Sequence, residues 1–316
     1  KLVEREASKV KTMGGSIYIT RATNITILQN SFRRNSAFKG AAINIGFVKY
    51  SFLISNSIVE NVATEQGGIS VYKCKETSII SNNIERNLGK GSRINGISGI
   101  SLLHIDNAKI FSSVFTENSS PSGIGGGLCI LKVNKSSIVN CTFLFNTARF
   151  GAGIFVTVSM RLSNFNNEFR GNVAYIGAVL VSNDVQYLVS SSCKFTNNTG
   201  IDGRGVFEVT SSKEIHNIRS IFRYNKGPNG KASVMEVTDV DVVYTTMCTF
   251  SNNSAGGSGG VILIIQVHAI HTISCAFSHN SADGNGGIIS SKNSGLIRNA
   301  FSLFSSSLAT TNGGVI

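Results

Sequence analysis

The stretch GAGIFVTVSMRLSNFNNEFRGN, residues 151 to 172, indicates the fold, because the motifs at its two ends recur along the chain. It starts with a small-residue step, Gly151-Ala152, and it ends in Phe-x-x-Asn, from Phe169 to Asn172. We call the first residue of Phe-x-x-Asn the anchor. Anchors recur every 26 to 31 residues, at Phe32, Ile58, Ile84, Phe115, Phe143, Phe169, Phe195, Phe222, Phe250, Phe277 and Phe304. A fixed period of this length is typical of a solenoid, in which each repeat forms one coil.

Within each repeat, apolar and polar residues alternate after the small-residue step. The residue fifteen positions before the anchor is always apolar, as at Ile154, and the residue two positions later is mostly apolar, as at Val156. Such alternation predicts a strand with one buried face. A second inward column lies ten positions before the anchor, as at Val185, and a third strand leads into the anchor. We therefore expect three short strands per coil.

This pattern predicts an all-β fold, a parallel β-helix solenoid of about eleven coils of about 27 residues. A helical solenoid needs apolar residues at a spacing of 3.6 over ten or more positions, and no window of the sequence has them. We expect one continuous domain over residues 1–316, forming a segment of a longer solenoid protein. The longer repeat intervals, around residues 89–99 and 119–125, are expected to be loops.

Asparagine fills the position three residues after nearly every anchor. An inward asparagine can form hydrogen bonds with its equivalents in the coils above and below, which offsets the cost of burying its amide. We therefore predict a structural asparagine ladder. Its members are Asn35, Asn61, Asn87, Asn118, Asn146, Asn172, Asn198, Asn225, Asn253 and Asn280.

A second column of small polar residues, two positions before the anchor, contains four of the six cysteines. Of these four, only Cys248 and Cys275 lie on adjacent coils, at a strand spacing that permits a disulfide. Small buried thiols are the preferred interpretation, because parallel side chains would have to move to form the bond. No Cys-x-x-Cys spacing is present, and neither a metal site nor a cofactor is expected.

The net charge of +12 suits an acidic partner. Five cations of the early coils, Arg21, Lys49, Lys73, Lys75 and Lys132, lie on neighbouring outward columns, and we call them the basic strip. An acidic glycan or an acidic protein surface is its expected partner, although dispersed solubilising charge explains the same residues. A nucleic acid is not expected, since no motif alternates basic and aromatic residues. The longest apolar run, residues 261–265, is too short to span a membrane.

Six Asn-x-Ser/Thr sequons make N-glycosylation and an extracellular or cell-surface location the expectation. The candidate asparagines are Asn24, Asn118, Asn134, Asn140, Asn197 and Asn252. Asn118 also belongs to the predicted ladder. An intracellular scaffold is the alternative, and unmodified asparagines in native material would favour it.

The pairing of Gly14-Gly15-Ser16-Ile17 with Phe32-Arg33-Arg34-Asn35 resembles the repeat of the chlamydial polymorphic membrane proteins, which are surface adhesins and autotransporters. Similar repeats occur in surface proteins of protists such as ciliates. The resemblance covers essentially the whole chain. It implies a right-handed β-helix of the pectin-lyase type and a role in adhesion.

Parallel β-helices often act on polysaccharides, and such chemistry needs paired carboxylates or an acid beside a base. Stacking of adjacent coils brings together Asp241 with His268 and Tyr244 with His271, and we call these four residues the histidine face. The preferred hypothesis is nevertheless a non-enzymatic extracellular solenoid, such as a surface coat, filament or adhesin component that self-associates end to end. The alternative is a carbohydrate-active or carbohydrate-binding solenoid that uses the face around Asp241 and His268.

Overall fold

The computed structural model describes residues 14–92, 96–202, 204–229 and 232–313. These residues form about eleven turns of about 27 residues, and none of them is helical. The predicted all-β parallel solenoid is therefore confirmed. The chain divides into two compact units, residues 1–155 and 156–316, each of which is described by itself. A single domain over the whole chain stays a prediction.

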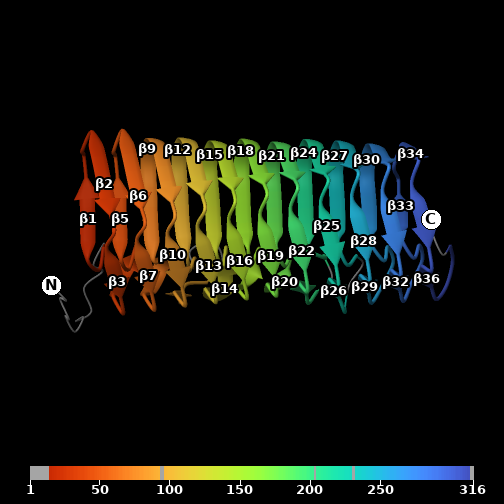
Figure 1. Ribbon diagram of the computed structural model, residues 1–316, viewed down its shortest axis with the longest axis horizontal. Helices are drawn as coiled ribbons and strands as arrows, with labels where there is room; N and C mark the ends of the chain where they lie inside the picture. The colour runs from red at the N-terminus through yellow and green to blue at the C-terminus, as the bar shows by residue number, and fades with distance from the viewer. Residues whose placement is uncertain (1–13, 93–95, 203, 230–231, 314–316) are drawn as a thin grey trace. The chain divides into compact units, whose positions relative to one another are not determined.

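The first sheet of each unit carries the alternating apolar residues. Its strands pair in parallel, and each residue lies beside its equivalent one repeat later, as Ile17 lies beside Ile43 and Ile43 beside Ile69. In unit 1 these strands are β1 (Ile17–Thr20), β2 (Asn24–Leu28), β5 (Ile43–Gly46), β6 (Tyr50–Ile54), β9 (Ile69–Ile80), β12 (Ile100–Phe111) and β15 (Leu128–Val139) (Figure 1). In unit 2 they are β21 (Leu180–Ser191), β24 (Phe207–Ile218), β27 (Met235–Thr246), β30 (Ile262–Ile273), β33 (Ile289–Lys292) and β34 (Leu296–Ala300). Strand β18 (Ile154–Phe165) crosses the unit boundary.

The two strands predicted before each anchor merge into one bent strand in most coils. In β9, β12 and β15 the bend lies at Lys73, His104 and Lys132, each of which has a φ of 53°. A left-handed residue turns the chain at a cost of about 1 to 2 kcal/mol when it is not glycine. The side chain at this bend is exposed in all three coils. The bend therefore turns the backbone without placing a polar side chain in the core.

The second sheet contains the anchors, each at the centre of a three-residue strand. In unit 1 its strands are β3 (Ser31–Arg33), β7 (Ser57–Val59), β10 (Asn83–Glu85), β13 (Val114–Thr116) and β16 (Thr142–Leu144). In unit 2 they are β19 (Glu168–Arg170), β22 (Lys194–Thr196), β25 (Ile221–Arg223), β28 (Thr249–Ser251), β31 (Ala276–Ser278) and β35 (Leu303–Ser305). The strands that the sequence predicts at the anchors are confirmed.

The strands of the third sheet come after the anchors in the chain, and the repeat pattern did not predict them. In unit 1 its strands are β4 (Ser36–Lys39), β8 (Val62–Gln66), β11 (Leu88–Gly89), β14 (Ser119–Ile124) and β17 (Thr147–Phe150). In unit 2 they are β20 (Val173–Ile176), β23 (Thr199–Gly200), β26 (Lys226–Gly227), β29 (Ser254–Ala255), β32 (Ser281–Ala282) and β36 (Leu308–Ala309). The loop expected at residues 119–125 is mostly strand β14, and the extra residues are absorbed as a register shift between Ser120 and Ile124.

The interior of each unit is filled by stacked anchors. Phe115 and Phe143 lie with ring centroids 4.5 Å apart and planes 1° from parallel, and Phe250 and Phe277 stack at 4.7 Å and 4°. All four rings are fully buried. One residue of this kind per coil buries a large apolar area at every step, which is the main stabilising contribution of such a core.

The predicted asparagine ladder is also present. The backbone N–H of Asn61 donates to Oδ1 of Asn87 at 3.0 Å, and the backbone N–H of Asn87 donates to Oδ1 of Asn118 at 3.1 Å. The side-chain nitrogen of Asn87 donates to the carbonyl of Ile58 at 2.9 Å. The chain turns at these positions, and the asparagine of the next coil supplies the acceptor for the backbone N–H there. The ladder therefore holds successive coils together at a corner.

Candidate functional site

The histidine face lies on β27 and β30 in unit 2. Tyr244 and His271 stack with ring centroids 5.1 Å apart, as the sequence predicts, and His216 of β24 stacks on the other side of Tyr244 at 4.8 Å. Nε2 of His216 also lies 2.9 Å from a carboxylate oxygen of Glu214. The result is a ladder of three half-buried rings that present their polar edges on the outside of the sheet.

Asp241 and His268 occupy equivalent exposed positions on the same two strands, between the paired residues Val240 with Val267 and Val242 with Ala269. The next coil has Gly295 at this position, and a hollow lined by Gln266, Val267, His268, Asn293 and Gly295 opens there. A Cβ on Gly295 would lie 2.4 Å from the carbonyl oxygen of His268, so glycine is needed for this approach. The structure thus gives the histidine face a small polar recess.

The chemistry that this face can perform is limited by how its groups are arranged. Among the described residues, Asp241 forms no ion pair with His268, and no group of three or more His, Cys, Asp or Glu side chains could hold a metal ion. The imidazole of His268 can form hydrogen bonds with a ligand lying in the recess, and the exposed carboxylate of Asp241 can accept hydrogen bonds on the preceding coil.

A second polar site, which sequence reasoning did not single out, lies on β24 and β27. Glu208 and Glu236 are direct neighbours in the parallel pair, and each is only 8% exposed. The guanidinium of Arg204 forms an ion pair with Glu208. Burial lowers the pKa of Arg204, but the charges of Glu208, Glu236 and Asp202 outweigh burial and raise that pKa. The sequence does show two glutamates at the same position of successive repeats. The strand alternation, however, predicts that side chains at this position face outward.

The basic strip does not form one continuous row. Arg21 and Lys73 share a left-handed corner with Phe47 between them, and Lys49 and Lys75 lie beside each other at the next outward position. Lys132 lies two coils beyond Lys73, and His104 occupies the corner between them. All five cations are exposed. Four of them therefore gather on the first described coils, and Lys132 stands apart.

Five of the six sequon asparagines have exposed side chains: Asn24, Asn134, Asn140, Asn197 and Asn252. Three of these, Asn140, Asn197 and Asn252, have φ values of 53° to 55° at outward corners. Asn118 is fully buried, and its amide nitrogen donates to Asn146 at 3.0 Å and to the carbonyl of Ile84 at 2.8 Å. The folded chain therefore cannot carry a glycan on Asn118, and five candidates remain.

The cysteines are free and buried, Cys248 and Cys275 included. The backbone N–H of Cys248 donates to Sγ of Cys275 at 3.4 Å, which is the same corner contact that asparagine and serine make elsewhere in this column. Burial raises the pKa of the thiols of Cys141 and Cys193 to about 11. These thiols fill the ladder position, in agreement with the preferred interpretation of the sequence.

No helix among the described residues is long and apolar enough to cross a membrane. Comparisons of the chain with models of protein families, with characterised proteins and with solved structures found no match. The resemblance to chlamydial polymorphic membrane proteins therefore stays a prediction that rests on the repeat motifs. At the level of architecture, the chain is a parallel β-solenoid.

Proposed function

We propose that this chain is a non-enzymatic structural solenoid of the cell surface, working as part of a coat, a filament or an adhesin. The observation that carries the proposal is that the repeated residues are used for stacking one coil on the next. Stacked anchors fill the core, and each ladder asparagine bonds to the following coil. A repeat used in this way provides length and stiffness, which are the properties of a structural element.

A surface location is part of the same proposal. Five sequon asparagines are exposed, and three of them lie at left-handed corners of the coils. The parallel strands also offer a way to self-associate, since a strand edge at one end of a coil stack can pair with another coil. That coil would belong either to more of the same chain or to a second copy.

The proposal is tested by electron microscopy of source-purified protein together with intact-mass and glycopeptide analysis of the same sample. Filaments or sheets with sugar on the exposed sequons are the expected result. Discrete, unglycosylated particles would contradict it and would favour an intracellular scaffold. Sugar on Asn118 would contradict the folded structure itself, because that side chain is fully buried.

A second candidate function is carbohydrate binding or turnover at the histidine face, and the recess beside His268 favours it. Its test is the double variant Asp241→Ala with His268→Ala, compared with the control variant His279→Ala with Asp283→Ala. The control removes the same two exposed side-chain types elsewhere in unit 2. Loss of polysaccharide binding or turnover in the first variant alone, with assembly unchanged, would replace the structural proposal. Equal behaviour of both variants would exclude this site.

A further inference from the structure

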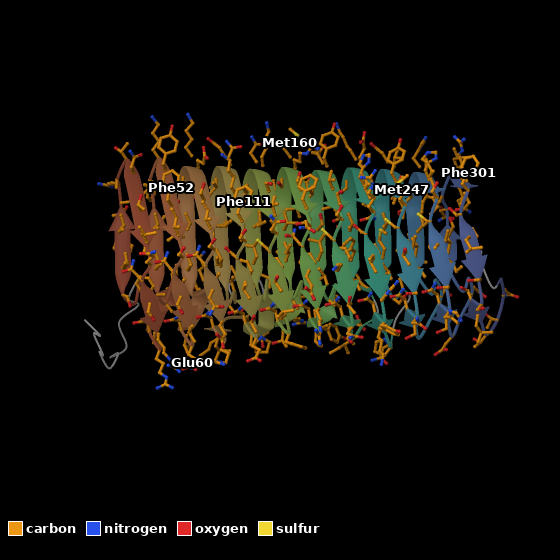
Figure 2. The ribbon with its side chains drawn as sticks, viewed as in Figure 1. Phe52, Glu60, Phe111, Met160, Met247 and Phe301 are labelled. Carbon is orange, nitrogen blue, oxygen red and sulfur yellow. The ribbon has the colours of Figure 1, made fainter. Side chains whose placement is uncertain are left out.

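The first described coils of unit 1 gather four cations and four aromatic residues on one outer corner, which we call the basic–aromatic patch. It consists of Arg21, Lys49, Lys73 and Lys75 together with Tyr18, Phe47, Tyr50 and Tyr72. Hydrogen bonds between the coils place these residues in register: Arg21 donates its backbone N–H to Gly46 and Phe47 donates to Tyr72. In Figure 2, long side chains that end in nitrogen project beyond the strands of these coils, on the side of Phe52.

The aromatic rings hold the ammonium groups in place. Nζ of Lys73 lies 4.7 Å from the ring centroid of Phe47, and Nζ of Lys49 lies 5.3 Å from that of Tyr50. Phe47 in turn packs edge-on against Tyr72, with centroids 5.6 Å apart. Such cation–π contacts reduce the freedom of a lysine side chain before any ligand arrives. The patch is therefore more ordered than scattered surface lysines.

The backbone also fits around the patch. The ring of Tyr72 lies over Gly46, so closely that a Cβ on Gly46 would be 2.1 Å from Cζ of the ring. Because Gly46 has no side chain, Tyr72 can lie flat across the neighbouring strand and bring its hydroxyl toward Tyr18. Burial and then the hydrogen bond with Tyr18 raise the pKa of Tyr72. Two tyrosine hydroxyls thus interact with each other on the strands that carry the patch.

Within the described chain, the positive charge of the patch exceeds the negative charge of the carboxylates beside it. Glu76 follows Lys75 directly, but its carboxylate is paired with Nζ of Lys109 at 2.6 Å. Elsewhere in unit 1, cations do have partners: Arg33, Arg34 and Arg86 share Glu60. Asp106 on β12 lies beside Lys75 on the next coil and forms no ion pair with any described residue, so the four cations of the patch adjoin one unpaired carboxylate. A ligand with negative charges would therefore supply what the patch lacks.

We propose that the basic–aromatic patch binds an acidic polysaccharide, a chain of sugars bearing carboxylate or sulfate groups, across the first coils of unit 1. Lys49 and Lys75 lie one coil spacing of about 4.8 Å apart, and Arg21 and Lys73 lie two coil spacings apart with Phe47 between them, so the patch presents charge at regular steps along the coils. The tyrosine hydroxyls suit the hydroxyls of the sugar. The patch does combine cations with aromatic rings, contrary to the expectation from the sequence, so single-stranded nucleic acid is the competing ligand. It fits less well, because a lysine covers one face of Phe47 and one face of Tyr50 and leaves fewer ring faces for base stacking.

This proposal names a partner for the proposed surface solenoid, but the two can fail separately. Binding is measured on the full chain by fluorescence anisotropy or calorimetry, with polygalacturonate, dextran sulfate, neutral dextran and a single-stranded DNA oligonucleotide as probes at one ionic strength. Binding of polygalacturonate or dextran sulfate, but not of dextran, is expected, and their ratio distinguishes carboxylate from sulfate. Tighter binding of the DNA, or no binding of either acidic polysaccharide, would overturn the proposal whatever the microscopy shows.

The decisive variant is the triple change Lys49→Gln, Lys73→Gln and Lys75→Gln. It is expected to weaken binding of the acidic polysaccharide at least about tenfold, because three aligned cations are lost. The matched control, Lys194→Gln, Lys213→Gln and Lys226→Gln, removes the same charge from exposed positions of unit 2 and is expected to change binding less than about twofold. Equal losses in both variants would show that net charge, and not the patch, is responsible.

A further variant tests the aromatic part. Phe47→Asn removes the ring, and asparagine tolerates the left-handed backbone found at this position. Binding is expected to fall severalfold while its dependence on salt concentration stays the same, because no charge is removed. Unchanged binding would show that the ring has no part in the site, and a changed circular dichroism spectrum would identify misfolding.

Discussion

The sharpest prediction compares two buried asparagines of unit 1 that the structure treats in opposite ways. Asn87 is 1% exposed, and its side chain makes four hydrogen bonds, two as donor to Ile58 and Asn118 and two as acceptor from Asn61, all between 2.9 and 3.0 Å. Asn44 is also fully buried, but neither polar atom of its side chain has a hydrogen-bond partner among the described residues.

The expected effect of Asn87→Ala follows from those four bonds. At about 1 kcal/mol each, their loss lowers the free energy of unfolding by about 4 kcal/mol. The backbone N–H of Asn61 and the carbonyl of Ile58 are left without these partners, which adds to the loss. For Asn44→Ala, removal of an unsatisfied polar group offsets the small cavity that it leaves, so the change is expected to stay within about 1 kcal/mol.

The two variants are compared by urea denaturation, followed by circular dichroism at several protein concentrations so that self-association is recognised. The midpoint of Asn87→Ala should fall far below that of the wild type, and the midpoint of Asn44→Ala should stay close to it. If both variants lose the same stability, then burial and packing, and not the hydrogen bonds of the ladder, determine the role of asparagine here. The reasoning about the ladder would then be refuted.

Three further predictions concern charge and thiols. The contact with Arg33 holds the pKa of Glu60 at about 2, below the unfolded value of about 4.3, so this carboxylate stabilises the fold above the unfolded pKa and loses that effect as pH falls through about 2. Glu60→Gln should therefore lower the melting temperature at neutral pH and not at about pH 1, and an equal shift at both would contradict this. The pKa values of about 11 keep the buried thiols of Cys141 and Cys193 protonated, so a thiol reagent at about pH 8 should label them only after denaturation. Rapid labelling of these two residues in the native chain would disprove their burial. Arg204→Met should lower the free energy of unfolding by about 1 to 2 kcal/mol in urea titrations at neutral pH. This loss is smaller than for a fully buried ion pair, because the side chain of Arg204 is 43% exposed. Unchanged stability would count against a stabilising ion pair.

Residues at equivalent positions of successive repeats allow some contacts of the candidate sites to be predicted, but not all of them. The stacking of Tyr244 on His271 was predictable, because one repeat period places them at the same position of adjacent coils. The pairing of Glu208 with Glu236 was predictable in the same way. Their burial was not, because the strand alternation assigns this position to the outside, whereas each residue is only 8% exposed in the structure. Alternation reports which face of a strand a residue occupies, and not what covers that face.

The basic strip shows the same limit for charge. The sequence placed the five cations on neighbouring outward columns, and the structure has Lys132 at the same left-handed corner as Lys73, two coils further on, with His104 between them. The contacts that make a patch of the other four cations, such as Lys73 on Phe47 and Lys49 on Tyr50, depend on how long side chains are oriented near a bend. No spacing along the chain records those rotations.

The all-β class, the period of the coils, the strands at the anchors and the asparagine ladder could be predicted from the sequence alone. Each of these follows from a residue type repeated at one position, because parallel stacking turns a sequence period directly into a spatial contact. The merged strands of the first sheet, the third sheet and the left-handed corners at residues such as Lys73 are visible only in the folded chain. These features depend on where the chain turns within a coil, and a turn occupied by many different residue types leaves no repeated residue to read.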